Sequence, residues 1–183
     1  LNLGAAGIEV TERGAVKVDE KLRTTAENIW ALGDVAGGLQ FTYISLDDSR
    51  IVKSQLFGDG SRTTQNRGTV PYSVFIDPPL SRAGLTEAEA RAKGYEVKIA
   101  KLPAGAIPKA QVLQRPTGLL KAVIDAKTNE ILGAHLFCAD SHEMINVVKV
   151  AMDAHVPYTV LRDSIFTHHI MSEVLNDLLS TVK

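Results

Sequence analysis

A histidine and a glutamate near the carboxyl end have the residue types and spacing of a general acid/base pair. His168 precedes Glu173 by five residues, where a short amphipathic helix is expected over residues 172–182. An imidazole titrates at about pH 6.5, and a neighbouring carboxylate orients the ring and raises its basicity. With His169 beside His168, the segment also fits a solvated pair of histidines on a loop, and the local pattern alone favours that simpler interpretation.

A second group of polar residues follows a hydrophobic segment upstream. Residues 29–32 form a short apolar run, typical of a buried parallel strand, and Gly33 and Asp34 end it. A carboxylate at that point can accept two hydroxyl groups of a ribose or ribityl chain. The first turn of the following helix, near Thr42, can offer free N–H groups to a polar ligand edge. A strand-end turn followed by a helix cap is the simpler explanation, and the Gly-Asp pair alone favours it.

Two other clusters are predicted to be structural. His135, Cys138 and His142 could be drawn as a metal site, but strand alternation is expected to send His135 and Cys138 to opposite faces. A buried thiol with two ordinary histidines is therefore favoured, and no metal site is predicted. Asp47 and Asp48 are interpreted as solvated helix surface.

The composition is that of an ordinary globular protein. The 183 residues are 45% hydrophobic and 22% charged with a formal net charge of −1, so no basic excess indicates nucleic acid. No apolar run reaches the roughly 18 residues of a membrane span, and we expect no signal peptide from the composition of the first residues. Cys138 is the single cysteine, which excludes an internal disulfide and makes a reducing cytoplasm the expected location.

The first 68 residues are expected to be part of a larger domain. They predict a hairpin over residues 8–19, the buried strand, and a helix over residues 43–57. A parallel strand needs neighbours on both sides, and this segment encodes none. Leu1 is not an initiator methionine, so we expect the sequence to be a piece of a longer chain. The polar stretch 61–68 is the best linker candidate.

Residues 69–183 predict an α+β domain with an antiparallel sheet and flanking helices. A capping box at Thr86 and Glu89 and a cap at Asp140 are expected to begin two helices ahead of the last one. Pro78 and Pro79 are expected to stop the first strand. The predicted strands cover residues 70–76, 95–102, 118–125 and 130–138.

Together these segments resemble one family. Residues 24–42, with Asp34 followed by Thr42 eight residues later, are similar to the second flavin-binding motif of the FAD-dependent pyridine nucleotide–disulfide oxidoreductases. Residues 41–48 most resemble the mercuric-reductase-like branch, in particular the reactive-chlorine resistance flavoproteins. Three later segments resemble the opening, the central hairpin and the interface helix of that family's C-terminal dimerisation domain: residues 75–87, 128–134 and 142–146.

The resemblance implies a homodimeric enzyme that carries FAD and uses NAD(P)H to reduce a small-molecule acceptor, without nucleic-acid or membrane partners. Residues 1–68 would be the C-terminal segment of its FAD-binding α/β domain, and residues 69–183 its dimerisation domain. The chain alone is expected to be inactive and to bind no cofactor tightly, because glycine-rich dinucleotide loops and a redox cysteine pair are absent from it.

The resemblance also implies roles for four residues. Asp34 would bind the ribityl chain of FAD, and the backbone at Thr42 would face the flavin ring. His168, supported by Glu173, would reach the other subunit's active site and act as acid/base in thiol–disulfide exchange.

Two positions depart from the family's pattern. His169 stands where the family has proline, and its peptide bond with His168 is expected to be trans, because a non-prolyl cis bond costs roughly 3–4 kcal/mol. Ile170 stands where the family has serine or threonine, and it cannot accept a capping hydrogen bond. Both changes are expected to alter the approach of His168.

Other functions stay open on the sequence alone. A non-catalytic interaction module could use the same α+β fold, and a histidine-rich metal-binding protein is a weaker alternative. The terminal electron acceptor is not determined by these residues, so a metal ion, a small disulfide and a quinone all remain candidates.

Overall fold

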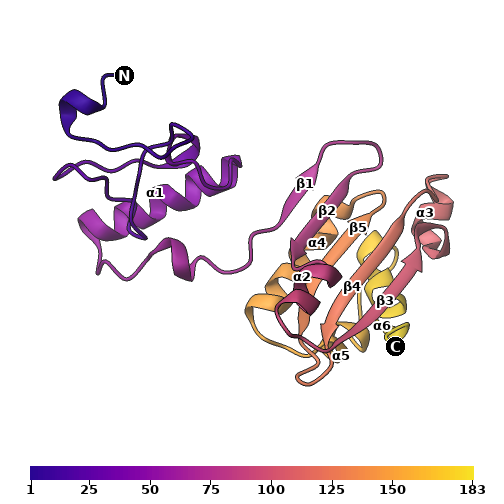
Figure 1. Cartoon of the computed structure of the whole chain (residues 1–183). Helices are drawn as coiled ribbons and strands as arrows, with labels where there is room; N and C mark the ends of the chain where they lie inside the picture. The colour runs from indigo at the N-terminus through magenta and orange to yellow at the C-terminus, as the bar shows by residue number, and fades with distance from the viewer. The chain divides into compact units, whose positions relative to one another are not determined.

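The computed structural model describes residues 1–183, which divide into two compact units, residues 1–68 and 69–183 (Figure 1). The first unit contains one long helix, α1 (Thr42–Phe57), in the place predicted for a helix. Its buried positions are Ile44, Asp48 and Ile51. The rest of the unit is irregular chain with three short 3-10 turns: Gly4–Ala6, Gly33–Ala36 and Thr64–Asn66.

The strands expected in the first unit are reduced to isolated bridges. Val10 and Val16 pair as one antiparallel bridge, and Trp30 pairs with Arg23 as another. The prediction of a buried parallel strand at residues 29–32 is wrong for this chain, since Ile29 and Leu32 are 38% and 37% exposed. The physical reason is that a parallel strand is completed by neighbouring strands, which these residues do not supply.

The second unit is built on one five-stranded antiparallel sheet with the order β1-β2-β5-β4-β3 (Figure 1). The α+β class predicted for it is confirmed. One central strand, β2, was not predicted. The strands are β1 (Tyr72–Val74), β2 (Leu80–Gly84), β3 (Val97–Pro103), β4 (Leu119–Asp125) and β5 (Ile131–Phe137).

Two helices cover one face of this sheet and enclose the core. Helix α4 (Ser141–Asp153) packs on β2 and β5, and α6 (Val174–Ser180) packs on β3 and β4. The short helix α5 (Tyr158–Arg162) packs against α6. The largest fully buried side chains between these layers are Leu120, Ile124, Leu136, Met144, Ile145, Leu175, Leu178 and Leu179. This packing holds the loop between α5 and α6, which carries His168.

Of two helix caps predicted in the second unit, one is present in the structure and the other is not. The capping box of α2 (Glu87–Ala92) is confirmed: Thr86 Oγ1 accepts from the Glu89 N–H, and Glu89 Oε2 accepts from the Thr86 N–H. The expected side-chain cap at Asp140 is wrong. Asp140 adopts a left-handed conformation (φ 55°, ψ 15°), and its carbonyl, not its carboxylate, accepts the first helical N–H groups.

Two further features of the helices complete the description. A short helix that the sequence did not predict, α3 (Pro108–Val112), begins at a proline, which is well suited to the first helical position. No helix in the structure combines the length and the apolar character that a bilayer-spanning segment needs.

Candidate functional site

His168 and Glu173 form a hydrogen-bonded pair in the loop that leads into α6. His168 Nδ1 lies 3.0 Å from Glu173 Oε2. An ionised carboxylate can only accept a hydrogen bond, so Nδ1 carries the proton of the pair and Nε2 of the neutral ring keeps its lone pair. This arrangement assigns Nε2 as the basic atom.

The two side chains differ in exposure. The His168 side chain is 77% exposed, whereas the Glu173 side chain is only 18% exposed. Its second oxygen, Oε1, is buried and has no hydrogen-bond partner. The carboxylate is therefore fixed in the protein, and it presents the imidazole to the outside with Nε2 free of any partner within the chain.

The backbone around His168 differs from the expectation at one point. The peptide bond between His168 and His169 is cis, so the predicted trans bond is wrong. The prediction used only the intrinsic preference of an isolated bond, which tertiary context can outweigh. The loss of the cap is confirmed, since Ile170 makes no side-chain hydrogen bond to the 3-10 turn Met171–Glu173 that precedes α6. The His168–Glu173 contact forms despite both departures.

Asn176 supports this loop and was missed by the sequence analysis. Its Nδ2 lies 2.8 Å from the carbonyl oxygens of Leu161 and Arg162 and 3.1 Å from that of Ser164. These carbonyls end α5, so Asn176 ties α5 to α6 on either side of the segment that holds His168. Nothing in the sequence distinguished Asn176 from the polar residues beside it, Glu173 and Ser180.

The second imidazole of the segment has a different neighbour. His169 Nδ1 lies 3.4 Å from Lys109 Nζ, and the His168 and His169 rings meet edge to face with centroids 5.2 Å apart. Lysine only donates, so His169 accepts through Nδ1. His169 is therefore a lateral neighbour of the pair and makes no contact with Glu173.

The flavin-site candidates lie in the first unit. Asp34 is exposed in the turn Gly33–Ala36, and its carboxylate makes no hydrogen bond within the chain, so both oxygens can accept hydroxyl groups. It lines an open pocket of about 780 Å³ together with Arg13, Gly14 and Gly37. Thr42 is the exposed first residue of α1, which begins without a side-chain cap, and it does not line this pocket.

These donors and acceptors match two polar parts of a flavin, the ribityl chain and the ring edge. A free carboxylate matches the hydroxyls of a ribityl chain. The uncapped start of a 16-residue helix matches a polar ring edge, because the N–H groups of Thr42 and Tyr43 have no acceptor within the chain. The residues present therefore fit the flavin that the resemblance implies.

The residues of the alternative metal site, His135, Cys138 and His142, do not form a cluster of ligands. Cys138 is buried and contacts Met144 through sulfur, and burial, with a contribution from Asp140, raises the pKa of its thiol to about 12. His135 Nε2 lies 3.3 Å from the Leu85 carbonyl, and His142 is exposed on α4. Nowhere in the structure do three His, Cys, Asp or Glu side chains gather as a metal site.

Asp47 and Asp48 are not the solvated surface that the sequence suggested. Asp48 is 3% exposed, and the Asp47 side chain is 14% exposed. Asp48 is spaced by four residues from Ile44 and by three from Ile51, so it shares their buried face. That spacing was the signal available in the sequence.

Family models match most of the chain. The model described as "Pyridine nucleotide-disulphide oxidoreductase, dimerisation domain" matches residues 70–179. The model described as "Pyridine nucleotide-disulphide oxidoreductase" matches residues 1–49. The two matches fall on opposite sides of the division between the units at Gly68 and Thr69.

The similarity of the chain to individual proteins agrees with these family matches. The probable pyridine nucleotide-disulfide oxidoreductase RclA of Escherichia coli is 61% identical over 97% of this chain, and a mercuric reductase of Bacillus cereus is 37% identical over 96%. This chain covers 40% and 28% of those two proteins. The solved structure of the HOCl-induced flavoprotein disulfide reductase RclA from Escherichia coli superposes with a TM-score of 0.97 at 60% identity, over all of this chain and 42% of that one. The chain belongs to the pyridine nucleotide-disulphide oxidoreductase family.

Proposed function

We propose that this chain is part of a homodimeric enzyme that uses FAD and NAD(P)H to reduce a disulfide or a metal ion. In this proposal, residues 69–183 supply the dimer interface, and His168 supplies an acid/base group to the partner subunit's active site. The single cysteine, free and buried, is consistent with a reducing cytoplasm. Because the chain spans about two fifths of the RclA protein, the rest of the active site is expected outside these residues.

The observation that carries the proposal is the His168–Glu173 pair. A base whose Nε2 is exposed, and whose orientation is fixed by a mostly buried carboxylate, is suited to proton transfer with a group that approaches from outside. The chain contains no reactive thiol for that base to serve, because its only cysteine is buried with a raised pKa. The base is therefore proposed to serve a thiol that another subunit presents.

The chemistry divides between the cofactor and these residues. Bound FAD would accept hydride from the nicotinamide and pass electrons to a cysteine pair. Asp34 would hold the ribityl hydroxyls, and the start of α1 at Thr42 would lie against the ring. His168 would take the proton from an attacking thiol at Nε2 and return it to the leaving thiolate, while Glu173 stabilises the imidazolium in between.

The test separates the two halves of the catalytic cycle in the full-length protein. His168→Ala should slow the oxidative half-reaction with the acceptor by about 10² to 10⁴, the usual contribution of general acid–base catalysis. It should leave flavin reduction by NADH or NADPH unchanged. Stopped-flow absorbance of the flavin measures both steps separately. Equal slowing of both steps would remove the proposed role of His168.

The acceptor is proposed only as a class. RclA structures from Escherichia coli include one described as a Cu(II) complex, and a relative from Bacillus cereus is a mercuric reductase, so both a disulfide and a soft metal ion are candidates. A purified full-length protein without a flavin spectrum would favour a non-catalytic interaction module instead.

A further inference from the structure

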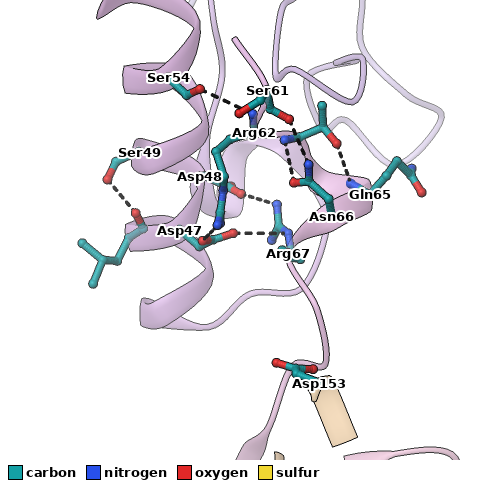
Figure 2. Close-up of polar contacts among 12 residues, drawn as sticks. Asp47, Asp48, Ser49, Ser54, Ser61, Arg62, Gln65, Asn66, Arg67 and Asp153 are labelled. Carbon is teal, nitrogen blue, oxygen red and sulfur yellow. Dashed lines mark hydrogen bonds and ion pairs between the residues drawn. The ribbon is translucent and has the colours of Figure 1, made fainter. Parts of the chain in front are cut away.

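A network of charged side chains, most of them largely buried, joins α1 to the segment that follows it (Figure 2). Arg62 Nη2 lies 2.6 Å from Asp47 Oδ1, and Arg67 Nη2 lies 2.7 Å from Asp48 Oδ1. Arg67 Nε also lies 3.6 Å from Asp47 Oδ2. Asp48 is the most buried member of the network, at 3% exposed. A buried ionised carboxylate is expensive unless it is fully paired, so its second oxygen needs a partner as well.

That second oxygen contacts the turn that carries Asp34. The Gly33 N–H donates to Asp48 Oδ2 at 2.8 Å. Gly33 itself lies close to α1, since a Cβ at this position would meet Ser45 Oγ at 2.8 Å, and its φ is +72°. One carboxylate therefore binds the turn with one oxygen and Arg67 with the other.

We propose that Asp48 is a positioning residue for the flavin site. By fixing the N–H group immediately before Asp34, it sets the direction in which Asp34 offers its carboxylate to the ribityl hydroxyls. Arg67 holds the Asp48 side chain in the orientation that this contact requires. The proposal rests on the proposed function, because it assumes that Asp34 binds FAD.

The adjacent residue, Asp47, provides a matched control. Asp47 pairs with Arg62 and lies near Arg67, and Asp48 pairs with Arg67. Unlike Asp48, Asp47 makes no contact with the turn that carries Asp34. Replacing Asp48 with leucine removes the close partner of the largely buried Arg67, and replacing Asp47 with leucine removes the partner of Arg62, whose side chain is 41% exposed. Both variants should lose stability. Only the Asp48 variant should also release the Gly33 N–H.

The experiment measures FAD affinity on the full-length apoprotein by flavin fluorescence, beside its urea stability without FAD. Asp48→Leu should weaken FAD binding about tenfold relative to Asp47→Leu, which corresponds to one lost hydrogen bond to a charged group. Asp48→Asn should bind FAD nearly as well as the wild type, because its amide oxygen can still accept from Gly33. If Asp48→Leu does not fold, Asp48→Glu keeps the charge but displaces the oxygen, and it should show the same loss.

Several outcomes would overturn the inference. Equal FAD affinities in Asp48→Leu and Asp47→Leu would reduce Asp48 to a stability element, and so would a loss in Asp48→Asn as large as in Asp48→Leu. Asp34→Ala separates this failure from that of the proposed function. If Asp34→Ala releases FAD while Asp48→Leu and Asp48→Glu retain it, only the positioning role fails. If the wild type holds no FAD, both fall.

Discussion

The Glu173 carboxylate decides which nitrogen of His168 is available for chemistry. Its contact with Nδ1 leaves Nε2 without a partner in the chain, and Glu173 is the last residue of the 3-10 turn Met171–Glu173 that follows the histidine. The pair was predicted through the family resemblance, because the local pattern alone favoured a solvated pair of histidines. The burial of Asp48 could have been inferred from its spacing to Ile44 and Ile51, but its partners, Gly33 and Arg67, lie 15 and 19 residues away, beyond the range of a local pattern.

Glu173→Gln tests the charge of this carboxylate apart from its shape. The glutamine oxygen can still accept from Nδ1–H, so the ring should keep its orientation, but the imidazolium loses its counter-charge. We expect Glu173→Gln to slow the oxidative half-reaction of the full-length enzyme by less than about 10²-fold. A slowing of about 10²-fold is the smallest effect expected when the base itself is removed. Stopped-flow comparison with His168→Ala measures the difference. A slowing as large as that of His168→Ala would assign a greater role to the carboxylate.

His135 predicts a pH dependence of stability. Burial lowers its pKa, and the neighbouring cations Arg82 and Lys121 act in the same direction, while the Leu85 carbonyl and Glu89 oppose them. As pH falls below about 6.5, histidine in the unfolded chain takes up a proton before folded His135 does. The unfolded state then binds more protons, so this residue lowers stability between the reference pKa and its own lowered pKa.

His135→Gln should remove that contribution. We expect urea unfolding to show a shallower loss of stability below about pH 6.5 in the variant than in the wild type. The measurement is a series of denaturation curves at stepped pH. Parallel pH profiles for the two proteins would show that His135 does not titrate differently on folding.

At the scale of elements, local pattern predicted the long strands and the longer helices, and tertiary pairing decided the remaining strand. The strands β3, β4 and β5 and the helix α1 lie where the sequence placed them. Strand β2 consists of Leu, Ser, Arg, Ala and Gly, which have little strand preference apart from Leu80, and it forms because it pairs along its length with β5. Its alternating burial follows from that register.

Gly84 at the end of β2 is predicted to tolerate no side chain. Its φ is +69°, and an added Cβ would meet the Leu132 carbonyl oxygen at 2.3 Å and Met152 Cε at 2.5 Å. Gly94 has a φ of +85° with no atom within 4 Å of its added Cβ, so it carries the same backbone strain without the clash.

We expect Gly94→Ala to lower the free energy of unfolding by about 1–2 kcal/mol, the strain of a left-handed residue. Gly84→Ala should lower it by about 1–3 kcal/mol more, through overpacking against backbone that cannot move aside. Urea denaturation of both variants measures the difference. Similar losses at the two positions would mean that the close approach at Gly84 relaxes freely.

At the scale of the whole molecule, the second unit has large apolar side chains that are exposed and take no part in its core. Four of its large apolar side chains are well exposed: Phe75 at 98%, Val112 at 65%, Val150 at 64% and Ile165 at 101%. Single exposed apolar residues need no partner, whereas a contiguous patch of them marks an interaction surface. The family model over residues 70–179 is described as a dimerisation domain, which favours a second copy of the chain as the partner.

Val150→Asp tests this assignment, because Val150 lies on the exposed side of α4. If α4 packs against a second copy, the new carboxylate would be buried without a partner, at a cost of about 3 kcal/mol or more. Dimerisation should then weaken by more than about 100-fold. Thr128→Asp adds the same charge on the exposed loop between β4 and β5, and it should leave the dimer intact. Size-exclusion chromatography with light scattering reads the mass of each variant. A wild type that stays monomeric at high concentration would contradict the dimer, and a dimer that survives Val150→Asp would place its interface away from α4.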